Sequence, residues 1–550
     1  MRILICHGYL LNGTGSNQYV QSLARALCKM GHHLVLFCQE SKPEIDFVSS
    51  YLRESAHSAG PELVWKKETP YEGTCMVYKP YIGEILPVFV LDDYPGFTVK
   101  EFPQLEESEL KNYVQMNKTS LKRLVKQFAP DAIIANHAVM LPYIAGEISE
   151  ETNIPFIVVI HGSAIEFAVK RDPRYFHYAL EGLERARWIV VPSEDSSERL
   201  TDLFSSNSDD LQKKVQVIPP GVDTSIFSSS EESIEDGVAK VIDAIKERLR
   251  GVRIVDFGKK EKRTEGQELN NVQFAAEIEA INAMHPDWLP DSDCIEKLRE
   301  ISSKKIPYII FVGKLLETKG IHCVIPALPL IKRNHPALRF VIVGFGPLRG
   351  ILELMVRAID AGDIRTLKRL CEFGNERYSG RIEKPFAPIL EFLSNFAGEG
   401  NLSDYLRLCI EGEISKSVVF TGYLSPEEHC HLLRHAKGFV FPSLAPEAFG
   451  MVVAEAMAAG VTPITAKHSG IRDALKPLEE VWGDEAQRLL IGTPEKLITR
   501  IAAATKELLD MPEEILKEKR KQLEKAACEY FSWETVAEKI CALVENDIEF

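Results

Sequence analysis

The sequence predicts an α/β protein built from two doubly wound, Rossmann-like domains with helical insertions. Two series of short apolar segments support this prediction, one starting at residue 2 and the other at Tyr308. Helical patterns separate the apolar segments within each series, and this alternation is typical of parallel sheets covered by helices. The length of 550 residues also fits, because at roughly 150 residues per domain the chain has room for about two to four domains.

The first series begins with a strand, a loop and a helix. Residues 2–10 form an apolar run, which the polar and glycine-containing residues 12–16 interrupt. Apolar side chains then recur at helical spacing from Val20 to Leu27, which predicts a helix that starts near Ser16 and ends at Gly31. The other elements expected in this series are a helix at Glu109–Phe128 and strands at His33–Phe37, Asp131–Ala135, Phe156–Ile160, Trp188–Val191 and Val215–Ile218.

The second series predicts another sheet, interrupted by two insertions. Of the 75 residues from 231 to 305, 30 are charged, which suits surface helices or a mobile arm better than core strands. Residues 351–417 have helical patterns and no clear strand. We therefore expect domains at 1–227 and 306–529, with insertions at 228–305 and 351–417. The strands expected in this series are Tyr308–Val312, Arg339–Val343, Val418–Thr421, Gly438–Phe441 and Thr462–Thr465.

The composition excludes several classes of protein. Apolar residues make up 45% and charged residues 26% of the chain, so it is neither disordered nor fibrous. The net charge of −15 argues against a nucleic-acid partner but leaves room for a local basic pocket that binds a small phosphate. The sequence contains neither a signal-peptide pattern nor an apolar run of membrane-spanning length, and its 11 cysteines include no CxxC pair. We expect a cytoplasmic protein with reduced thiols and no transmembrane segment.

Two glutamates mark the strongest candidate site. Glu447 lies in the loop after the predicted strand Gly438–Phe441, and Gly450 then lets the chain turn into a helix that starts near Met451. Glu455 falls within this otherwise apolar helix, where an unpaired carboxylate is unfavourable. Ligand hydroxyls would satisfy the carboxylate, and the amides at the helix N-terminus would bind a phosphate. A capping role for Glu447 and an internal salt bridge for Glu455 are equally consistent with the sequence.

Other candidates lie in loops that follow predicted strands. The loop from Gly13 to Gly15 precedes a helix, so it either binds an anion or forms a plain tight turn. Lys314 and Lys319 follow the strand Tyr308–Val312 and either clamp a diphosphate or are merely solvated. His161 ends the strand Phe156–Ile160 and either faces a ligand cleft or caps the sheet.

Two further patterns each have a simpler alternative. His431 and His435 are spaced like zinc ligands on a helix, next to His429, but no further ligand has suitable spacing, so we favour a solvated helix face. The segment Lys111–Lys126 interleaves lysines with apolar residues, as an interfacial membrane helix does. We favour a helix that packs its apolar stripe on the sheet and leaves its lysines in water.

A chain-ordered set of motifs connects these candidates. Its members are Gly13–Gly15, His161-Gly162, Ile218–Asp223, Val312–Gly320, Val343–Pro347, Phe420–Gly422 and Pro446–Glu455. Together they resemble the GT-B fold glycosyltransferases of family 4, or group 1, which are retaining enzymes with an E-x7-E signature. The resemblance covers roughly 1–227, 306–350 and 418–545, so both insertions fall outside it. It also implies a C-terminal helix at 530–550 that crosses back onto the first domain.

The resemblance implies a hexosyltransferase with a central cleft between its domains. The second domain would hold a nucleotide-sugar donor and the first an acceptor. Glu447 would contact the donor sugar, Glu455 the ribose hydroxyls, and Lys314 and Lys319 the diphosphate. The family usually has arginine in place of Lys314, so the planar fork of that contact is lost here. His161 would lie beside the donor sugar. The backbone amides that would hold the donor belong to Gly13, Gly15, Phe449, Gly450, Met451 and Val452.

The family resemblance implies that Glu447, His161 and Lys319 are the catalytic residues and that neither a metal nor a cofactor is required. The acceptor would be a sugar, a small molecule or a lipid-linked molecule, and the last would bring the protein to a membrane surface. Two enzymes remain as alternatives, a GT-B sugar-nucleotide epimerase and a glycogen phosphorylase-like enzyme. A third alternative is a catalytically degenerate protein that only binds sugar nucleotides.

Overall fold

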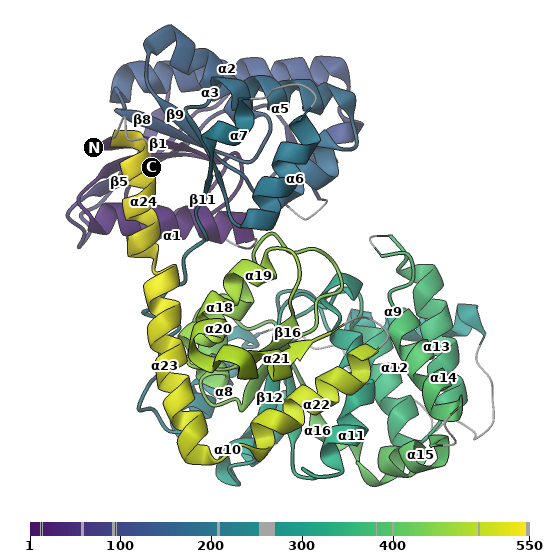
Figure 1. The fold of residues 1–550 in the computed structure, drawn as a ribbon. Coiled ribbons are helices and arrows are strands. Elements are labelled where there is room, and N and C mark those ends of the chain that lie inside the picture. Colours follow the sequence, from purple (N-terminus) through teal and green to yellow (C-terminus); the bar gives the residue numbers. More distant parts are fainter. Residues whose placement is uncertain are drawn as a thin grey trace. The chain divides into compact units, whose positions relative to one another are not determined.

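The computed structural model describes residues 1–11, 13, 15–56, 60–90, 94, 96–205, 210–251, 270–380, 382–398, 401–492 and 496–545. The chain divides into two compact units, each of which is described by itself (Figure 1). The first unit comprises Met1–Gly221 and Phe531–Phe550, and the second comprises Val222–Tyr530. The described residues of the charged segment 228–305 therefore belong to the second unit.

The first unit is built on a mainly parallel sheet. Over the described residues it has nine strands in the order β11-β10-β9-β8-β1-β2-β5-β3-β4, and only β3 and β4 pair antiparallel. The chain builds outward from β1 to β2 and later returns on the other side at β8, which makes a topological switch point. The strands are β1 (Arg2–Cys6), β2 (His33–Phe37), β3 (Val48–Arg53), β4 (Glu62–Lys66), β5 (Thr74–Lys79), β8 (Ala132–Asn136), β9 (Phe156–Val159), β10 (Trp188–Val191) and β11 (Val215–Val217).

Five apolar strands of this sheet match the sequence prediction to within one residue at each end, whereas β1 ends at Cys6, four residues before the end of the apolar run 2–10. The more polar strands are not predicted. The unpredicted strands are β3, β4, β5 and the separate two-stranded pair β6 (Ile85–Val88) and β7 (Thr98–Glu101). Every residue of the edge strand β4 is at least partly exposed. Except for β6, which is apolar and contains Pro87, these strands lack the continuous apolar run that marks a strand buried on both faces.

Helices cover both faces of the first sheet (Figure 1). They are α1 (Gly15–Lys29), α2 (Glu107–Phe128), α3 (Leu141–Thr152), α4 (Gly162–Ala164), α5 (Pro173–Arg185), α6 (Glu194–Phe204), α7 (Leu211–Lys214) and α24 (Trp533–Glu545). Successive residues of β1 point to opposite layers, as the period of a strand requires. Leu4 and Cys6 enter the core formed with α2, α3 and α5, and Ile3 and Ile5 enter the core formed with α1 and α24.

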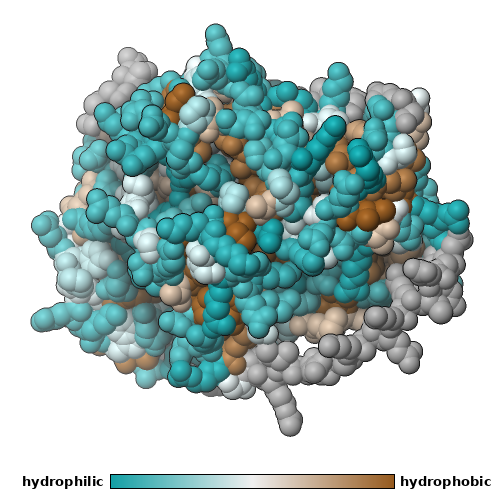
Figure 2. Space-filling view, turned by 90° about the horizontal axis from the view of Figure 1, so that it is seen from below, coloured by the Kyte–Doolittle hydropathy of each residue, from teal (hydrophilic) through white to brown (hydrophobic). Residues whose placement is uncertain are grey.

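The α2 helix packs its apolar stripe inward. Leu110, Leu121 and Leu124 are buried, and its basic side chains Lys118 and Lys122 form ion pairs with glutamates of α3 at 2.9 and 2.7 Å. In the described part of the chain, no helix has the length and apolar character needed to cross a membrane. On the face that Figure 2 shows, hydrophilic side chains predominate and hydrophobic ones form separate groups.

The second unit contains a parallel sheet with the order β14-β13-β12-β15-β16-β17. Its strands are β12 (Tyr308–Val312), β13 (Arg339–Val343), β14 (Val418–Gly422), β15 (Gly438–Phe441), β16 (Pro463–Ala466) and β17 (Leu490–Ile491). The chain runs outward from β12 to β14 and then crosses to β15 on the other side of β12, so a second switch point lies between β12 and β15. The fold class predicted from the sequence, two Rossmann-like α/β domains, is confirmed.

Most helices of the second unit belong to the predicted insertions or follow strands. They are α8 (Ile234–Arg248), α9 (Asn271–Met284), α10 (Cys294–Ser303), α11 (Leu328–Lys332), α12 (Arg349–Asp360), α13 (Ile364–Arg377), α14 (Ala387–Gly398), α15 (Leu402–Glu411), α16 (Ile414–Ser417), α17 (Pro426–Leu433), α18 (Met451–Ala458), α19 (Ile471–Ala474), α20 (Lys476–Trp482), α21 (Ala486–Leu489), α22 (Leu497–Asp510) and α23 (Glu513–Phe531). The two insertions pack against each other, since α9 contacts α12 and α13. Within the first insertion α8 contacts α10, and α8 also contacts α17, which lies outside both insertions.

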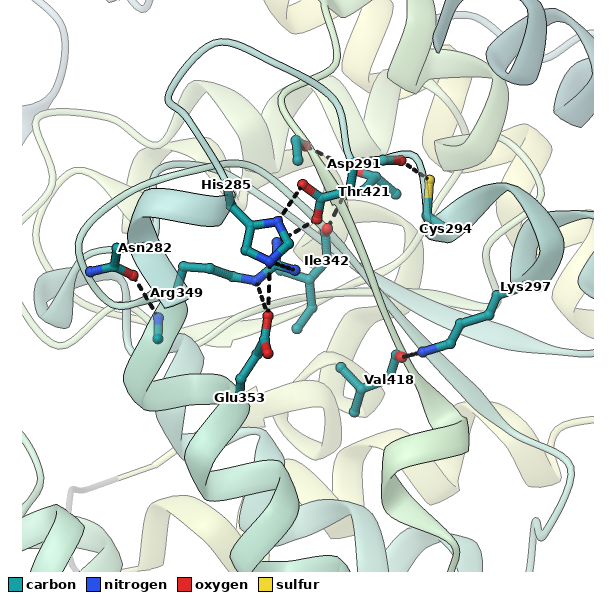
Figure 3. A network of polar contacts seen from close by, with 12 residues as sticks. Asn282, His285, Asp291, Cys294, Lys297, Ile342, Arg349, Glu353, Val418 and Thr421 are labelled. Atoms are coloured by element: carbon teal, nitrogen blue, oxygen red, sulfur yellow. Dashed lines mark hydrogen bonds and ion pairs between the residues drawn. The ribbon is translucent and has the colours of Figure 1, made fainter. Parts of the chain in front are cut away.

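A buried charged network fastens the first insertion to α12 (Figure 3). His285 lies 3.0 Å from Asp291 and 3.3 Å from Glu353, and Arg349 bridges the same two carboxylates at 2.5 and 3.0 Å. Burial alone would lower the pKa of His285, but the hydrogen bonds to the two carboxylates outweigh it and raise this pKa to about 9. The Asp291 amide also donates to the Thr421 carbonyl at 2.7 Å. The segment from His285 to Asp291 is thereby fixed beside β14.

The expected solvated helix face is wrong for His429 of α17, whereas His431 and His435 are partly exposed. The His429 side chain is buried, and burial lowers its pKa to about 4. The reason is that α8 covers this helix and the ring of Phe227 lies 5.5 Å from that of His429. His431 is 2.7 Å from a carboxylate oxygen of Glu232. Across the described residues, no group of three or more side chains is arranged to hold a metal ion.

Candidate active site

The predicted site residues of the second unit lie at the carboxyl edge of its sheet, around the switch point. Four loops meet there, following β12, β13, β15 and β16 respectively. Backbone hydrogen bonds connect them, because the Leu444 amide donates to the Thr318 carbonyl at 2.8 Å and the Gly470 amide donates to the Glu447 carbonyl at 3.0 Å. Ligands of open α/β sheets bind at this kind of position.

Lys319 and Glu447 form the central ion pair of this edge. The Lys319 ammonium donates to both carboxylate oxygens of Glu447, at 2.7 and 2.8 Å. The Ser443 hydroxyl donates to one of the same oxygens at 2.8 Å. Both partners of the pair are only partly exposed, with 25% of the Lys319 side chain and 16% of the Glu447 side chain accessible. A short 3₁₀ turn, Glu317–Lys319, delivers the lysine to this position.

Residues after β16 orient the backbone of Glu447. The Glu447 amide donates to the Ser469 hydroxyl oxygen at 2.9 Å. The ring of His468 lies beside both serines of this edge, with Nδ1 3.0 Å from the Ser469 hydroxyl and Nε2 2.8 Å from the Ser443 carbonyl. Since a carbonyl only accepts, Nε2 carries the proton, and Nδ1 is left to accept from Ser469. None of these partners was predicted, although each lies just beyond a predicted strand.

The α18 helix presents an open N-terminus next to this ion pair. Gly450 is its N-cap and adopts φ 98°, a left-handed conformation that turns the chain into the helix. No side chain of the described residues caps the helix, and its first turn contains no acidic residue. The amides of Met451 and Val452 therefore remain available for an anion, which the helix dipole also favours.

Glu455 projects from the same helix without a partner. Its carboxylate forms neither a hydrogen bond nor an ion pair with any described residue, so the internal salt bridge considered from the sequence is not present there. The side chain is half-buried, and burial raises its pKa from 4.5 to about 7. An uncompensated carboxylate in an apolar helix is unfavourable unless a ligand supplies donors.

Lys314 contacts two aromatic rings of the second unit. Its side chain is exposed, and its ammonium lies 5.8 Å from the ring centre of Trp288 and 5.5 Å from that of Phe345. These distances fit cation–π contacts. Trp288 belongs to the first insertion, where no sequence pattern singled it out.

His161 occupies the corresponding edge of the first unit, after β9. Its Nε2 lies 3.0 Å from the Asn136 amide oxygen, and the Asn136 amide nitrogen donates to the Cys6 carbonyl at 3.2 Å. This arrangement places the proton on Nε2 and leaves Nδ1 as an acceptor. Burial lowers the pKa of His161 to about 3, helped by the nearby His7, so the ring is neutral at physiological pH.

The glycines of the first loop lie at the start of α1. Gly13 and Gly15 are both exposed, and Gly13 has φ 101°, while Thr14 between them lies outside the described residues. Gly15 is the first residue of α1, where amides lack partners within the helix. Tyr19 of the same helix packs edge-on against His161, with ring centres 5.2 Å apart. The loop and His161 therefore neighbour each other through α1.

Sequence models of two families match the chain in order. The model described as "Glycosyltransferase Family 4" matches residues 92–226, and the model described as "Glycosyl transferases group 1" matches residues 295–365 and 391–530. Neither covers 227–294, which includes most of the first insertion.

Similar proteins agree with these matches. An MMP alpha-(1->4)-mannosyltransferase of Mycolicibacterium hassiacum is 35% identical over 142 residues, which are 26% of this chain and 32% of that protein. A glycogen synthase of Mycobacterium tuberculosis is 24% identical over 230 residues, 42% of this chain and 40% of that protein. The matched stretches thus span a third to two fifths of these relatives.

Solved structures show the same fold at low sequence identity. The sucrose-phosphate synthase of Thermosynechococcus elongatus superposes with a TM-score of 0.54 at 16% identity, covering 98% of both chains. The N-terminal domain of a Candida albicans trehalose-6-phosphate phosphatase gives 0.51 at 12% identity, covering 100% of this chain and 97% of that one. The chain thus has a GT-B fold, and two glycosyltransferase family models, group 1 and family 4, together match more than half of its length.

Proposed function

We propose that the protein is a retaining, metal-independent hexosyltransferase that uses a nucleotide-sugar donor. The observation that carries this proposal is the Lys319–Glu447 pair beside the uncapped N-terminus of α18. In this proposal the Lys319 ammonium and the helix amides would bind a diphosphate, and the Glu447 carboxylate would accept from sugar hydroxyls. Lone Glu455 supports the same reading, because the two ribose hydroxyls of a nucleotide supply the donors that its carboxylate lacks.

Donor binding would change the partners of Lys319 and Glu447. A diphosphate binds the Lys319 ammonium more strongly than a single carboxylate does, since it carries more negative charge and more acceptor oxygens. Glu447 would then turn its oxygens to the hydroxyls of the donor sugar while Ser443 holds it in place. Lys314 and the amides of Met451 and Val452 would complete the diphosphate site, and the amides of Phe449 and Gly450 would contribute beside them.

Cleavage of the anomeric bond leaves positive charge on the sugar and negative charge on the nucleoside diphosphate. Lys319 and the α18 N-terminus are suited to stabilise that negative charge, which is the task a divalent cation performs in other transferases. The leaving phosphate would accept the proton of the acceptor hydroxyl, so that the acceptor enters on the face from which the diphosphate departs. His161, neutral and with Nδ1 free to accept, would orient a sugar hydroxyl rather than act as an acid.

The test is a panel of nucleotide sugars incubated with the purified protein, with free nucleoside diphosphate as the readout. We expect slow release from one donor, faster release with the right acceptor, and a loss of about 100-fold or more in Glu447→Ala. Glu507→Ala is the matched control, because Glu507 is a partly exposed glutamate whose ion pair is with Arg488, away from the site. Unchanged turnover in Glu447→Ala would contradict the assigned role.

Further readouts separate the alternatives. The anomeric configuration of the product, followed by NMR, should equal that of the donor, and added EDTA should leave the rate unchanged. A sugar-nucleotide epimerase would isomerise the donor without releasing nucleoside diphosphate. A binding protein with a degenerate site would show thermal shifts with a donor but no turnover with any acceptor.

A further inference from the structure

We propose that Trp288, supplied by the first insertion, forms with Phe345 and Tyr423 an aromatic wall on which the nucleobase of the donor stacks. The inference rests on the proposed function, because it assumes that the donor is a nucleotide sugar. It concerns the part of the donor that the Lys319–Glu447 pair does not reach.

The three rings form one cluster at the carboxyl edge of the second sheet. The ring centres of Trp288 and Phe345 are 4.5 Å apart, those of Trp288 and Tyr423 are 5.0 Å apart, and those of Phe345 and Tyr423 are 5.7 Å apart. Phe345 follows β13 and Tyr423 follows β14, so the wall adjoins the loop after β12 that bears Lys314. Trp288 and Tyr423 keep part of their surface exposed.

The charges around the wall match a nucleotide. The Lys314 ammonium lies over Trp288 and Phe345, and the Arg248 guanidinium carbon lies 5.0 Å from the ring centre of Tyr423. A nucleoside diphosphate joins a flat aromatic base to an anionic phosphate chain. A partly exposed aromatic surface with an adjacent exposed ammonium is complementary to both parts, and such surfaces stack bases of any identity.

The insertion holds Trp288 firmly in this place. The Arg248 guanidinium donates to the carbonyl of Trp288 at 2.6 Å and to the carbonyl of Tyr423 at 3.1 Å, so it fixes two members of the wall together. Pro290 forms an antiparallel bridge with Gly422, and the Tyr423 amide donates to the Leu289 carbonyl at 3.0 Å.

Gly422 makes this close approach feasible. Its φ is 68°, and a Cβ atom there would lie 2.5 Å from the Leu289 carbonyl oxygen, so a larger residue would push the Trp288 segment away. On the other side the His285–Asp291–Arg349–Glu353 network anchors the same segment (Figure 3). Trp288 itself has φ 66°, which is unfavourable for a residue with a side chain and persists only where the surroundings impose it.

Trp288 lies in residues 227–294, which neither family model matches. A purely structural role of Trp288 would explain how the insertion packs. It would not explain why the ring of Trp288 stays half-exposed beside Lys314. The two readings differ in one measurable respect. A structural residue affects all ligands alike, whereas a stacking residue affects only ligands that have a base.

The experiment compares UDP, GDP, ADP and TDP with inorganic pyrophosphate, by calorimetry on the full chain. We expect wild type to bind at least one nucleoside diphosphate, and Trp288→Ala to weaken that binding by about 5- to 100-fold, the usual range for one stacked base. Pyrophosphate binding should be unchanged. Trp288→Phe keeps a ring and should retain most of the affinity.

Tryptophan fluorescence gives a second readout that does not depend on the alanine variant folding well. The nucleoside diphosphate should quench fluorescence in wild type and in Trp65→Phe, a half-exposed tryptophan of the other unit, but not in Trp288→Phe. Equal affinities in wild type and Trp288→Ala, or parallel losses for pyrophosphate and nucleotide, would overturn the inference while leaving the proposed function intact. Absence of binding by wild type to every nucleoside diphosphate would overturn both.

Discussion

Replacing Glu455 by glutamine tests whether its carboxylate is stabilised only by a ligand. Burial raises the pKa of Glu455 from 4.5 to about 7, and a carboxyl group with a raised pKa destabilises the folded protein once the pH exceeds its unfolded value. The destabilisation is absent well below pH 4.5, grows as the pH rises and reaches its full size above about pH 7. At about 1.4 kcal/mol per pKa unit the upper limit is about 3.5 kcal/mol, and residual solvent contact lowers our expectation to about 1–3 kcal/mol.

The assay is thermal and urea unfolding of wild type and Glu455→Gln without ligand, from pH 5 to pH 8. We expect the variant to be the more stable protein, with a gap that is small at pH 5 and widens toward pH 8. Glu507→Gln, which replaces a partly exposed glutamate of α22, should show no such gap. Glu455→Gln should also bind the donor more weakly than wild type, because a charged acceptor makes a stronger hydrogen bond to a ribose hydroxyl than an amide does.

Two results would refute this reasoning. A variant that is less stable than wild type at pH 8, or a gap that does not depend on pH, would show that the folded protein already compensates the carboxylate. Higher stability combined with unchanged donor affinity would leave the burial argument standing and remove Glu455 from the ribose site.

Two further predictions concern charges. Lys319→Met should weaken pyrophosphate binding by about 10-fold or more, since its ammonium is the partly buried cation of the site, while Lys416→Met, an exposed lysine paired with Glu413, should leave it unchanged. Equal binding by both would contradict the diphosphate role. The stabilising contribution of His285, whose pKa is raised to about 9, should be fully present below pH 6.5 and disappear as the pH rises through about 9. Unfolding of wild type and His285→Gln across this range checks it, and parallel pH profiles would contradict it.

The sequence predicted the strands that are buried on both faces, because continuous apolar runs identify them. Strands such as β3 and β4 escaped prediction, since serines, charged residues and an exposed edge remove that signal. The fold of the insertions was predicted only as helical. Their packing depends on contacts such as that between Phe274 of α9 and Phe373 of α13, which are far apart in the chain and follow no pattern.

The sequence indicated which residues belong to the site and where they lie in the chain. It did not indicate which of their side chains contact each other. The spacing of Glu447 and Glu455 marked both, yet nothing in it distinguishes a glutamate that is paired from one that has no partner. The contact of Glu447 with Lys319 joins residues 128 positions apart. Asn136 was also missed, although its place at the end of a predicted strand was the available signal, and Trp288 had no signal at all.

The charges of the resting site suggest why its two glutamates differ. Lys319 and Glu447 neutralise each other, whereas burial raises the pKa of Glu455 and disfavours its charged form. Under the proposed function, a diphosphate that takes Lys319 leaves Glu447 without its cation unless sugar hydroxyls replace it. A nucleotide alone therefore leaves one carboxylate unsatisfied, and a complete nucleotide sugar satisfies both. The protein would thus bind the nucleotide sugar more tightly than the nucleoside diphosphate, because only the whole donor replaces both partners of the Lys319–Glu447 ion pair. The same difference in affinity would favour release of the nucleoside diphosphate after the sugar has been transferred.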